Sequence, residues 1–341
     1  TYELWIRPKF WMLNFVSDCR IFQNKSALSI IKSVLTENGV TDFQDHTSSS
    51  GHRTREYCVQ YNETCFDFVS RLMEEEGICY YFSHNNGSHT MFLTDYQNGH
   101  KPCPSLHKAR FMPGKGSEHF ENVVIRAQSI EQVTIAKQSC ADYNFTTAST
   151  PLYATISGRG AGGMFYHYPG FFDHEDKPNQ GGVEMDASTR LDMELLPKEA
   201  LEGVSTIPFL THGHYFSLSG YDRKGADGDY VVHSVTHRIT ANTHVVDNQT
   251  VYENSFVAFP KKVRYRPPHI HKKHRIYSTQ TARVTGKPGE EIWTDQYGRI
   301  KVKFHWDESG PHKGPSDDKS SCWIRVSEGW AGSKWGILFT P

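Results

Sequence analysis

Short segments in which apolar and polar residues alternate, each bounded by turn residues, recur along most of this chain. The first places Tyr2, Leu4 and Ile6 on one side of an extended backbone and stops at Pro8. Aromatic residues make up 13% of the sequence, and its 27 glycines supply turns between short strands. The alternation predicts a mainly β protein with few helices (α+β), in which residues 2–7 form the first strand.

Two segments break the alternation and predict helices, near residues 26–38 and 64–76. In the first, Ser26 is a suitable N-cap, an apolar face follows at helical spacing, and Gly39 ends the pattern. In the second, Thr64 opens a pattern that resembles a capping box.

A hairpin is expected after the second helix, with strands near 78–82 and 90–93. Its turn is Asn86-Gly87, the strongest short signal for a hairpin. Between residues 120 and 265 the sequence shows only β-type patterns, so no further helix is expected there.

The chain has 341 residues, which predicts two or three domains. A proline-flanked stretch rich in lysine, arginine and histidine marks a boundary. We therefore assign residues 1–265 to a first region, residues 266–280 to a basic Pro/His linker and residues 281–341 to a second domain. Loops are expected in the first region at 171–182 and 222–229.

The second domain has the clearest strand pattern. A tight turn at Asp295 to Gly298 leads into a strand over 299–306, and another strand is expected over 322–326. The apolar face of the 299–306 strand comprises Ile300, Val302, Phe304 and Trp306. Its other face comprises Lys301, Lys303 and His305. This pattern predicts a small barrel in which Trp306 belongs to the core.

Charge and cysteine content exclude several classes of protein. The net charge is −1, whereas duplex-binding proteins need a basic excess to neutralise phosphates, so nucleic acid is not an expected partner. Seven cysteines occur without a Cys-x-x-Cys pair, which predicts reduced, mostly buried thiols. The sequence shows no apolar run that could cross a bilayer and no signal peptide. Because it opens at Thr1 without Met, we expect that the natural N-terminus lies elsewhere.

Histidine spacing is the strongest argument for an enzyme. Three groups have spacings that could gather a metal: His212 with His214, His233 with His237, and His269 with His271 and His274. None carries the glutamate of a His-Glu-x-x-His helix, and the third group lies among lysines and arginines that repel a cation. The sequence therefore predicts no enzyme: no catalytic residues, no cofactor and no metal ligands.

Two other motifs also have simple explanations. Residues 158–163 match the letters of a dinucleotide-binding loop, but the aromatic stretch after them, closed by Pro169, leaves no room for the required helix. We expect a flexible loop there. The run Glu74, Glu75, Glu76 could suggest acid/base carboxylates, but consecutive residues on a helix point in different directions. Because the run lies on the polar side of its helix, we expect it on a solvated face.

Several short blocks, in the same order as in a known family, give the chain a specific resemblance. The longest is residues 290–307 (EEIWTDQYGRIKVKFHWD), followed by 320–326 (SSCWIRV) and 330–332 (WAG). Upstream blocks are residues 20–24 (RIFQN), 60–64 (QYNET), 67–72 (DFVSRL), 75–78 (EEGI) and 168–170 (YPG). Together they resemble the VgrG spike proteins of type VI secretion, which are similar to the fused hub and tail-spike proteins of contractile phages.

The resemblance implies a structural protein of a cell-puncturing device. Residues 1–265 would form β-barrel-like hub domains, and residues 281–341 an OB-fold that is incomplete at its C-terminal end. Members of the family are homotrimers that sit on a hexameric (Hcp-like) tube ring, carry effectors and briefly contact the target membrane. Such a protein would be assembled in the bacterial cytoplasm and then injected without a signal peptide. The family pattern normally begins about a hundred residues earlier, and its needle is absent here.

Two alternatives belong to other classes. One is a metal-dependent hydrolase that uses His212, His214, His233 and His237. The other is an OB-type module that binds carbohydrate or nucleic acid, with Lys301, Lys303 and Trp323 on an exposed face. Oligomeric state, metal content and salt-dependent binding to single strands would separate the three hypotheses.

Overall fold

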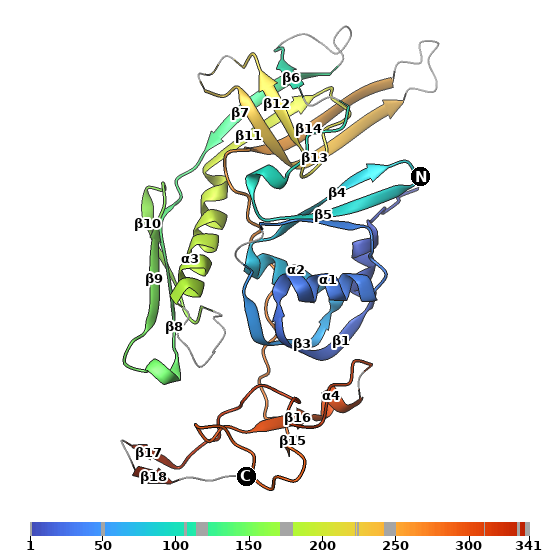
Figure 1. The fold of residues 1–341 in the computed structure, drawn as a ribbon. Helices are drawn as coiled ribbons and strands as arrows, with labels where there is room; N and C mark the ends of the chain where they lie inside the picture. The colour runs from blue at the N-terminus through green and yellow to red at the C-terminus, as the bar shows by residue number, and fades with distance from the viewer. Residues whose placement is uncertain are drawn as a thin grey trace.

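The computed structural model describes residues 2–48, 52–105, 108–113, 122–170, 180–221, 223, 225–241, 250–309, 311–332 and 335–337. The chain forms an N-terminal α+β unit, a closed barrel, a small sheet covered by a helix, and a C-terminal module (Figure 1). Strands outnumber helices, which confirms the expected mainly β class. Within the described ranges, no helix has the length and apolar character needed to cross a bilayer.

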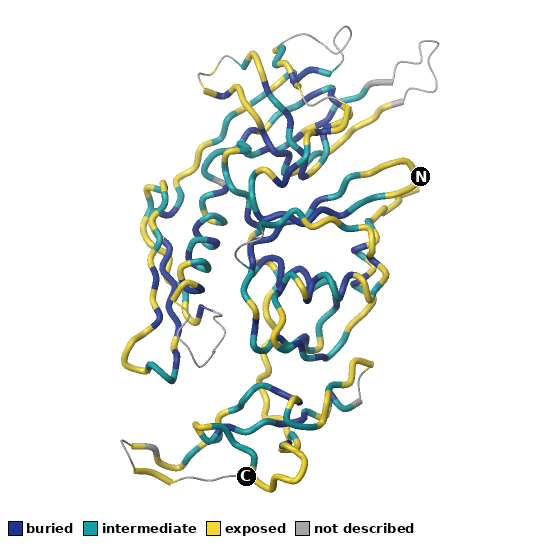
Figure 2. The backbone as a smooth tube through the Cα atoms, in the orientation of Figure 1, coloured by how far each residue is buried: buried dark blue, intermediate teal, exposed yellow. Residues whose placement is uncertain are grey.

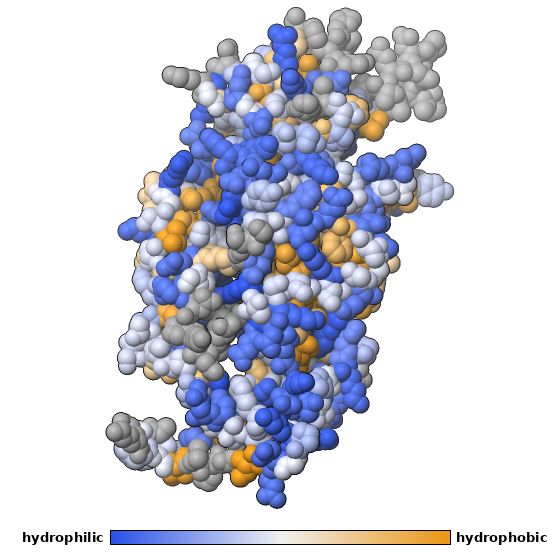
Figure 3. Space-filling view, viewed as in Figure 1, coloured by the Kyte–Doolittle hydropathy of each residue, from blue (hydrophilic) through white to orange (hydrophobic). Residues whose placement is uncertain are grey.

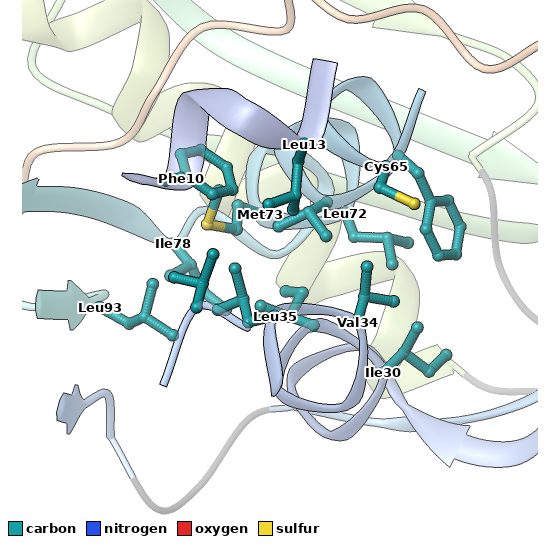
Figure 4. Packing of buried hydrophobic residues seen from close by; sticks show 14 of the residues in the cluster. Phe10, Leu13, Ile30, Val34, Leu35, Cys65, Leu72, Met73, Ile78 and Leu93 are labelled. Atoms are coloured by element: carbon teal, nitrogen blue, oxygen red, sulfur yellow. The ribbon is translucent and has the colours of Figure 1, made fainter. Parts of the chain in front are cut away.

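The N-terminal unit holds two helices that pack against each other (Figure 4). Its elements are η1 (Lys9–Phe15), β1 (Ser17–Ser26), α1 (Ala27–Glu37), β2 (Phe43–His46), β3 (Thr54–Thr64), α2 (Cys65–Glu76), β4 (Cys79–Asn85) and β5 (Ser88–Thr94). Strand β1 pairs with β3, and the second sheet has the order β2-β5-β4. Ile30, Val34 and Leu35 of α1 meet Leu72 and Met73 of α2, all almost completely buried.

Both predicted helices and their caps are confirmed. The Ser26 Oγ accepts a hydrogen bond from the Ser29 N–H (3.2 Å), and the Thr64 Oγ1 accepts one from the Asp67 N–H (3.0 Å). Helix α2 stops at Gly77, whose φ of 65° is left-handed and favours glycine. Strands β4 and β5 form the predicted hairpin around the Asn-Gly turn.

The strand expected over residues 2–7 is wrong. This segment has no helix or strand, and the side chains of Tyr2, Leu4 and Ile6 are 97%, 82% and 90% exposed. A strand needs a partner for its N–H and C=O groups. None of the described strands pairs with this segment.

A closed six-stranded barrel forms one end of the molecule in Figure 1. Its strands are β6 (Lys108–Phe111), β7 (Val123–Glu131), β11 (Glu199–Ser205), β12 (Tyr215–Ser219), β13 (Gly228–Ala241) and β14 (Thr250–Pro260). Around the barrel they follow the order β11-β14-β13-β12-β6-β7. Its interior is filled by Phe216, Phe256 and Leu218, so it is a packed core and not a pore. The predicted loop at 222–229 overlaps the start of β13.

The expectation of only β structure between 120 and 265 is wrong at α3 (Gln180–Leu195). This helix covers the sheet β10-β8-β9, formed by β8 (Ile135–Asp142), β9 (Leu152–Ser157) and β10 (Gly162–His167). Val183, Ala187 and Leu191 recur every fourth residue and are buried. The helix also takes up the last three residues of the loop predicted at 171–182; residues 171–179 lie outside the described part of the chain.

Short 3-10 turns connect some of these elements: η2 (Gln97–Gly99), η3 (Phe145–Thr147) and η4 (Leu196–Lys198). Burial is concentrated around α1, α2, α3 and the barrel interior, whereas much of the C-terminal module is exposed (Figure 2). The C-terminal module contains β15 (Ala282–Thr285), β16 (Lys301–Phe304), α4 (His305–Ser309), β17 (Trp330–Gly332) and β18 (Trp335–Ile337). In its described residues the strands form two separate pairs, β15-β16 and β17-β18.

The strand pattern predicted for this module is correct only in part. The turn is confirmed, since the Gly298 N–H donates to the Asp295 carbonyl (3.2 Å). The strand that follows ends at Phe304 because α4 begins there, so Trp306 stands on the helix and is only half-buried. The strand expected over 322–326 is reduced to one bridge between Ile300 and Ile324.

The hypothesis of an OB-type binding module places Lys303 on an exposed face, and this is also wrong. Its side chain is completely buried, and its Nζ donates to Asp307 Oδ2 and to the Gly314 carbonyl, both at 2.6 Å. A buried ammonium group is tolerated when it is paired in this way. Alternation of residue types cannot report such a pair, because it treats every lysine as solvated.

Candidate functional site at the joint with the C-terminal module

Several specific polar contacts gather at the joint between the N-terminal unit and the C-terminal module. Residues 266–280 carry no helix or strand and run past the C-terminal end of α2 (Figure 1). The linker therefore lies against α2, and three groups of contacts fix the linker and the C-terminal module to the N-terminal unit.

The first group of contacts is made by Glu74. Its Oε2 accepts hydrogen bonds from the Ile270 and His271 N–H groups, both at 2.9 Å, and its Oε1 lies 2.6 Å from His271 Nδ1. Glu74 is only 6% exposed. A buried carboxylate without partners would be costly, so these bonds fix the position of the connecting backbone.

The second group of contacts is made by Arg266. Its Nη1 donates to the Gly77 carbonyl at the end of α2 (2.7 Å), and its Nε lies 3.9 Å from Asp192 on α3. Carbonyls at a helix C-terminus lack partners within the helix, and a cation there is favourable. A Cβ added to Gly77 would lie 2.7 Å from the Arg266 side chain, so the close approach requires glycine.

The glutamate run was expected on a solvated face, and the structure corrects this. Glu75 lies 2.6 Å from Arg55 and 3.5 Å from Arg71, and Glu76 lies 2.7 Å from Arg55. Burial alone would raise the pKa of Glu75, but Arg55, Arg71 and Lys273 together lower that pKa to about 2. The glutamates are buried because β3 and the linker cover the last turn of α2, which no local sequence pattern shows.

The C-terminal module makes the third group of contacts. Gln280 Nε2 donates to the Tyr61 hydroxyl (2.7 Å), and Trp306 Nε1 donates to Gln280 Oε1 (3.2 Å). The Tyr61 and Trp306 rings meet edge to face, with centroids 5.6 Å apart. On the same side, Gln23 Nε2 donates to the Lys319 carbonyl (2.7 Å). Trp306 thus belongs to an interface with β3.

A second surface of interest is the outer face of the sheet β10-β8-β9. The strand pleat turns Tyr153, Met164 and Tyr166 away from α3, and they are 48%, 51% and 59% exposed. We call these three residues the exposed sheet face. In the space-filling view, hydrophobic colour appears at the left edge, where β10 lies, on an otherwise mostly hydrophilic surface (Figure 3). Large exposed apolar groups of this kind mark contact surfaces.

The structure brings two of the candidate histidines, His212 and His233, to the wall of one cavity, but it does not arrange the candidates as a metal site within the described residues. The His237 Nδ1 lies 2.6 Å from the Tyr252 hydroxyl, and the His271 Nδ1 is held by Glu74. Across the described ranges, no three His, Cys, Asp or Glu side chains are placed to hold a metal ion. The metal-dependent hydrolase therefore lacks a site in this part of the chain.

The face proposed for an OB-type binding module does not form as predicted either. Lys303 is buried, and the Lys301 Nζ donates to the Asp318 carbonyl (2.7 Å) while lying 5.0 Å from the centre of the Trp323 ring. At the glycine-rich segment 158–163, β10 follows where a dinucleotide site needs a helix, and a Cβ at Gly160 would meet the Ile135 carbonyl. All seven cysteines are free.

Comparisons with known proteins agree with the fold. Residues 1–243 match the phage tail baseplate hub (GPD) family. The whole chain is 36% identical to the type VI secretion system spike protein VgrG1b of Pseudomonas aeruginosa and 37% identical to VgrG1c of the same organism. It covers 46% and 47% of those two proteins, so it spans about half the length of the relatives it matches.

Two solved structures share the fold. One is the E. coli c3393 protein, a component of the type VI secretion system with structural similarity to the T4 bacteriophage tail proteins gp27 and gp5. The likeness covers 93% of this chain and 70% of that one, with a TM-score of 0.61 and 20% identity. The other is a chain of the half-lidded Francisella PdpA-VgrG complex, with a TM-score of 0.54 and 10% identity over 96% of this chain and 56% of that one.

Proposed function

Since the chain belongs to the phage tail baseplate hub family, as a structural component of the VgrG spike type, we propose that it forms a spike hub and couples that hub to the puncturing end. Residues 1–265 are the hub in this proposal, residues 266–280 are the linker, and residues 281–341 begin an OB-fold. The role is mechanical and needs no catalytic residue, cofactor or metal.

The proposed assembly is a homotrimer that caps a hexameric (Hcp-like) tube ring, carries effectors and contacts the target membrane only while passing through it. It is put together in the bacterial cytoplasm and leaves by injection, without a signal peptide. These partners follow from the family resemblance; of the proteins compared, the Francisella VgrG is in a complex with PdpA.

The observation that carries the coupling role is the attachment of the linker at both ends. Glu74 and Arg266 tie its start to α2, and Gln280 ties its end to Tyr61 and Trp306. Axial force on the C-terminal module therefore reaches the helical core through several directional hydrogen bonds. A free linker of this length would instead let the module swing.

Glu74→Gln in the full-length protein tests the coupling. The amide keeps the size of the side chain but turns an NH2 group towards N–H donors that need acceptors, so the linker should detach from α2. We expect normal trimers by light scattering but loss of tube-ring protein release from the cells. Glu194→Gln, on the exposed side of α3, is the matched control. Normal release with Glu74→Gln would contradict the coupling role.

The exposed sheet face is our candidate for part of the trimer contact. Tyr166→Asp should shift the trimer towards monomer, because a carboxylate would be desolvated in an apolar interface. Val133→Asp, an 82% exposed position just before β8, should leave the trimer intact. Gel filtration with light scattering gives the answer. A wild-type protein that runs only as a 39.0 kDa species at micromolar concentration would count against the trimer itself.

A further inference from the structure

A cavity of about 250 Å³ lies between α2, β13 and the start of the linker, away from every contact that the proposed function uses except the Glu74–His271 pair at its edge. Its walls are mainly apolar and aromatic. Two pairs of rings define one side: His233 and Phe259 with centroids 5.1 Å apart, and His233 and Tyr265 with centroids 5.8 Å apart. Met73 and Ile78 also line the cavity.

Two buried polar atoms in the cavity wall lack hydrogen-bond partners among the described residues. They are the Ser70 Oγ, on a residue that is only 4% exposed, and the His233 Nδ1. Buried hydroxyl and imidazole groups are nearly always hydrogen-bonded in native proteins, because an unmade bond is costly. Both atoms are therefore available to form a hydrogen bond with a molecule that enters the cavity.

The charge of the lining selects the kind of molecule. Burial lowers the pKa of both His100 and His233, so these imidazoles are neutral at neutral pH. Among the described residues that line the cavity, Glu74 is the only carboxylate, and it is already hydrogen-bonded to the linker. The described lining contains no lysine or arginine that could attract an anion. A charged ligand would lose its hydration without gaining a counter-ion.

We propose that this cavity is a binding site for a neutral bicyclic aromatic molecule of about the size of indole, which donates one hydrogen bond to the Ser70 Oγ or the His233 Nδ1. The size follows from volume, since a cavity of about 150 Å³ takes up benzene. The aromatic walls supply the stacking surface, and the orphan atoms supply the orientation. Occupancy ties the linker more firmly to α2, since Pro267, Pro268 and Ile270 of the linker form part of the wall.

The test compares indole with indene, which has the same shape but no N–H group, by ligand-observed NMR titration of the chain. We expect saturable binding of indole, about five- to tenfold tighter than that of indene. Ser70→Ala or His233→Phe, whichever residue accepts the bond, should remove this preference. Ser70→Leu fills the cavity and should abolish binding of both probes.

His237→Ala is the matched control, because His237 lies on the same strand but outside the cavity and bonds Tyr252. Circular dichroism confirms that each variant is folded. If Ser70→Leu does not fold, the comparison of indole with indene in the other variants still tests the proposal. Absence of binding at millimolar indole would overturn the proposal, and so would an indole preference that survives in both Ser70→Ala and His233→Phe.

Discussion

At the scale of single residues, Gly77 shows how the joint constrains the sequence. Two glycines end helices with left-handed φ values, Gly39 at 74° and Gly77 at 65°. An added Cβ meets nothing within 4 Å at Gly39, whereas at Gly77 it meets Arg266 and Thr189 at 2.7 and 2.8 Å. A substitution at Gly39 therefore tests backbone strain alone, whereas a substitution at Gly77 tests backbone strain together with steric crowding against Arg266.

Gly77→Ala should be clearly more destabilising than Gly39→Ala. We expect Gly39→Ala to cost about 1 kcal/mol of unfolding free energy, from the left-handed backbone alone. Gly77→Ala should cost about 1–3 kcal/mol more, because Arg266 must leave the end of α2. Urea unfolding of both variants measures the difference. Equal costs would show that Arg266 is not fixed against Gly77.

The charge cluster around Glu75 makes the unfolding free energy depend on pH in the acidic range. The pKa of Glu75 is lowered from 4.5 to about 2 in the folded chain, so its contribution is present above about pH 4.5 and is lost as the pH falls towards 2. The shift corresponds to about 3 kcal/mol. We expect the unfolding free energy to drop between pH 4.5 and 2, and to drop less in Glu75→Gln. The same pH dependence in both proteins would refute the role of Glu75.

At the scale of elements, the sequence allowed α1, α2 and the β4–β5 hairpin to be predicted because each carries its own local signal. Ser26, Thr64 and the Asn-Gly turn act within a few residues of themselves. Helix α3 lacks such a signal. Two glycines follow Gln180, and serine, threonine and aspartate interrupt its apolar stripe, so its helical form depends on packing against the sheet.

Leu191→Ala tests that dependence. Leu191 is 4% exposed between α3 and its sheet, and truncation should cost about 2–4 kcal/mol. Because propensity does not hold the helix, hydrogen exchange should speed up along all of α3. Glu194→Ala, on the exposed side, should leave both properties unchanged. Fast exchange confined to residues next to 191 would argue that α3 is stable by itself.

The candidate site was the least predictable part, since most of its contacts join residues far apart in sequence. Glu74 and His271 are separated by 197 positions, and Gln280 and Tyr61 by 219. The glutamates, histidines and Trp306 were each visible in the sequence, but their partners were not. The error over Trp306 has the same origin, because the alternation of 299–306 continues past the point where α4 begins.

Trp306→Ala should therefore loosen the joint instead of emptying a core. The half-buried indole stacks on Phe304, contacts Tyr61 and donates to Gln280. We expect faster proteolysis within residues 266–280 and a loss of about 1–2 kcal/mol, below the 3–5 kcal/mol of a fully buried tryptophan. Trp330→Ala, at a 57% exposed position, should leave the rate of proteolysis in the linker as in the wild type. A loss of about 3–5 kcal/mol would instead indicate that Trp306 is buried in a core.

At the scale of the whole molecule, the docking of the hub on its tube ring is a question of symmetry. A trimer can meet a six-fold ring without leaving half of the ring unpaired only if each chain presents two related units. The barrel β11-β14-β13-β12-β6-β7 is one such unit and lies at the end of the molecule opposite the C-terminal module (Figure 1). We therefore expect the barrel end to face the ring and the C-terminal module to point away from it.

The net charge of −1 then decides how this contact responds to salt. A nearly neutral chain provides little long-range steering, so the interface should depend on shape and apolar contact. We expect the affinity of the full-length protein for tube-ring protein to change less than about threefold between 50 and 200 mM salt, because few charge pairs are screened. Co-sedimentation at both salt concentrations measures this, and cryo-microscopy shows which end is bound. A tenfold loss in salt would indicate an ionic interface, and absence of any association would remove the basis for assigning a hub role to this chain.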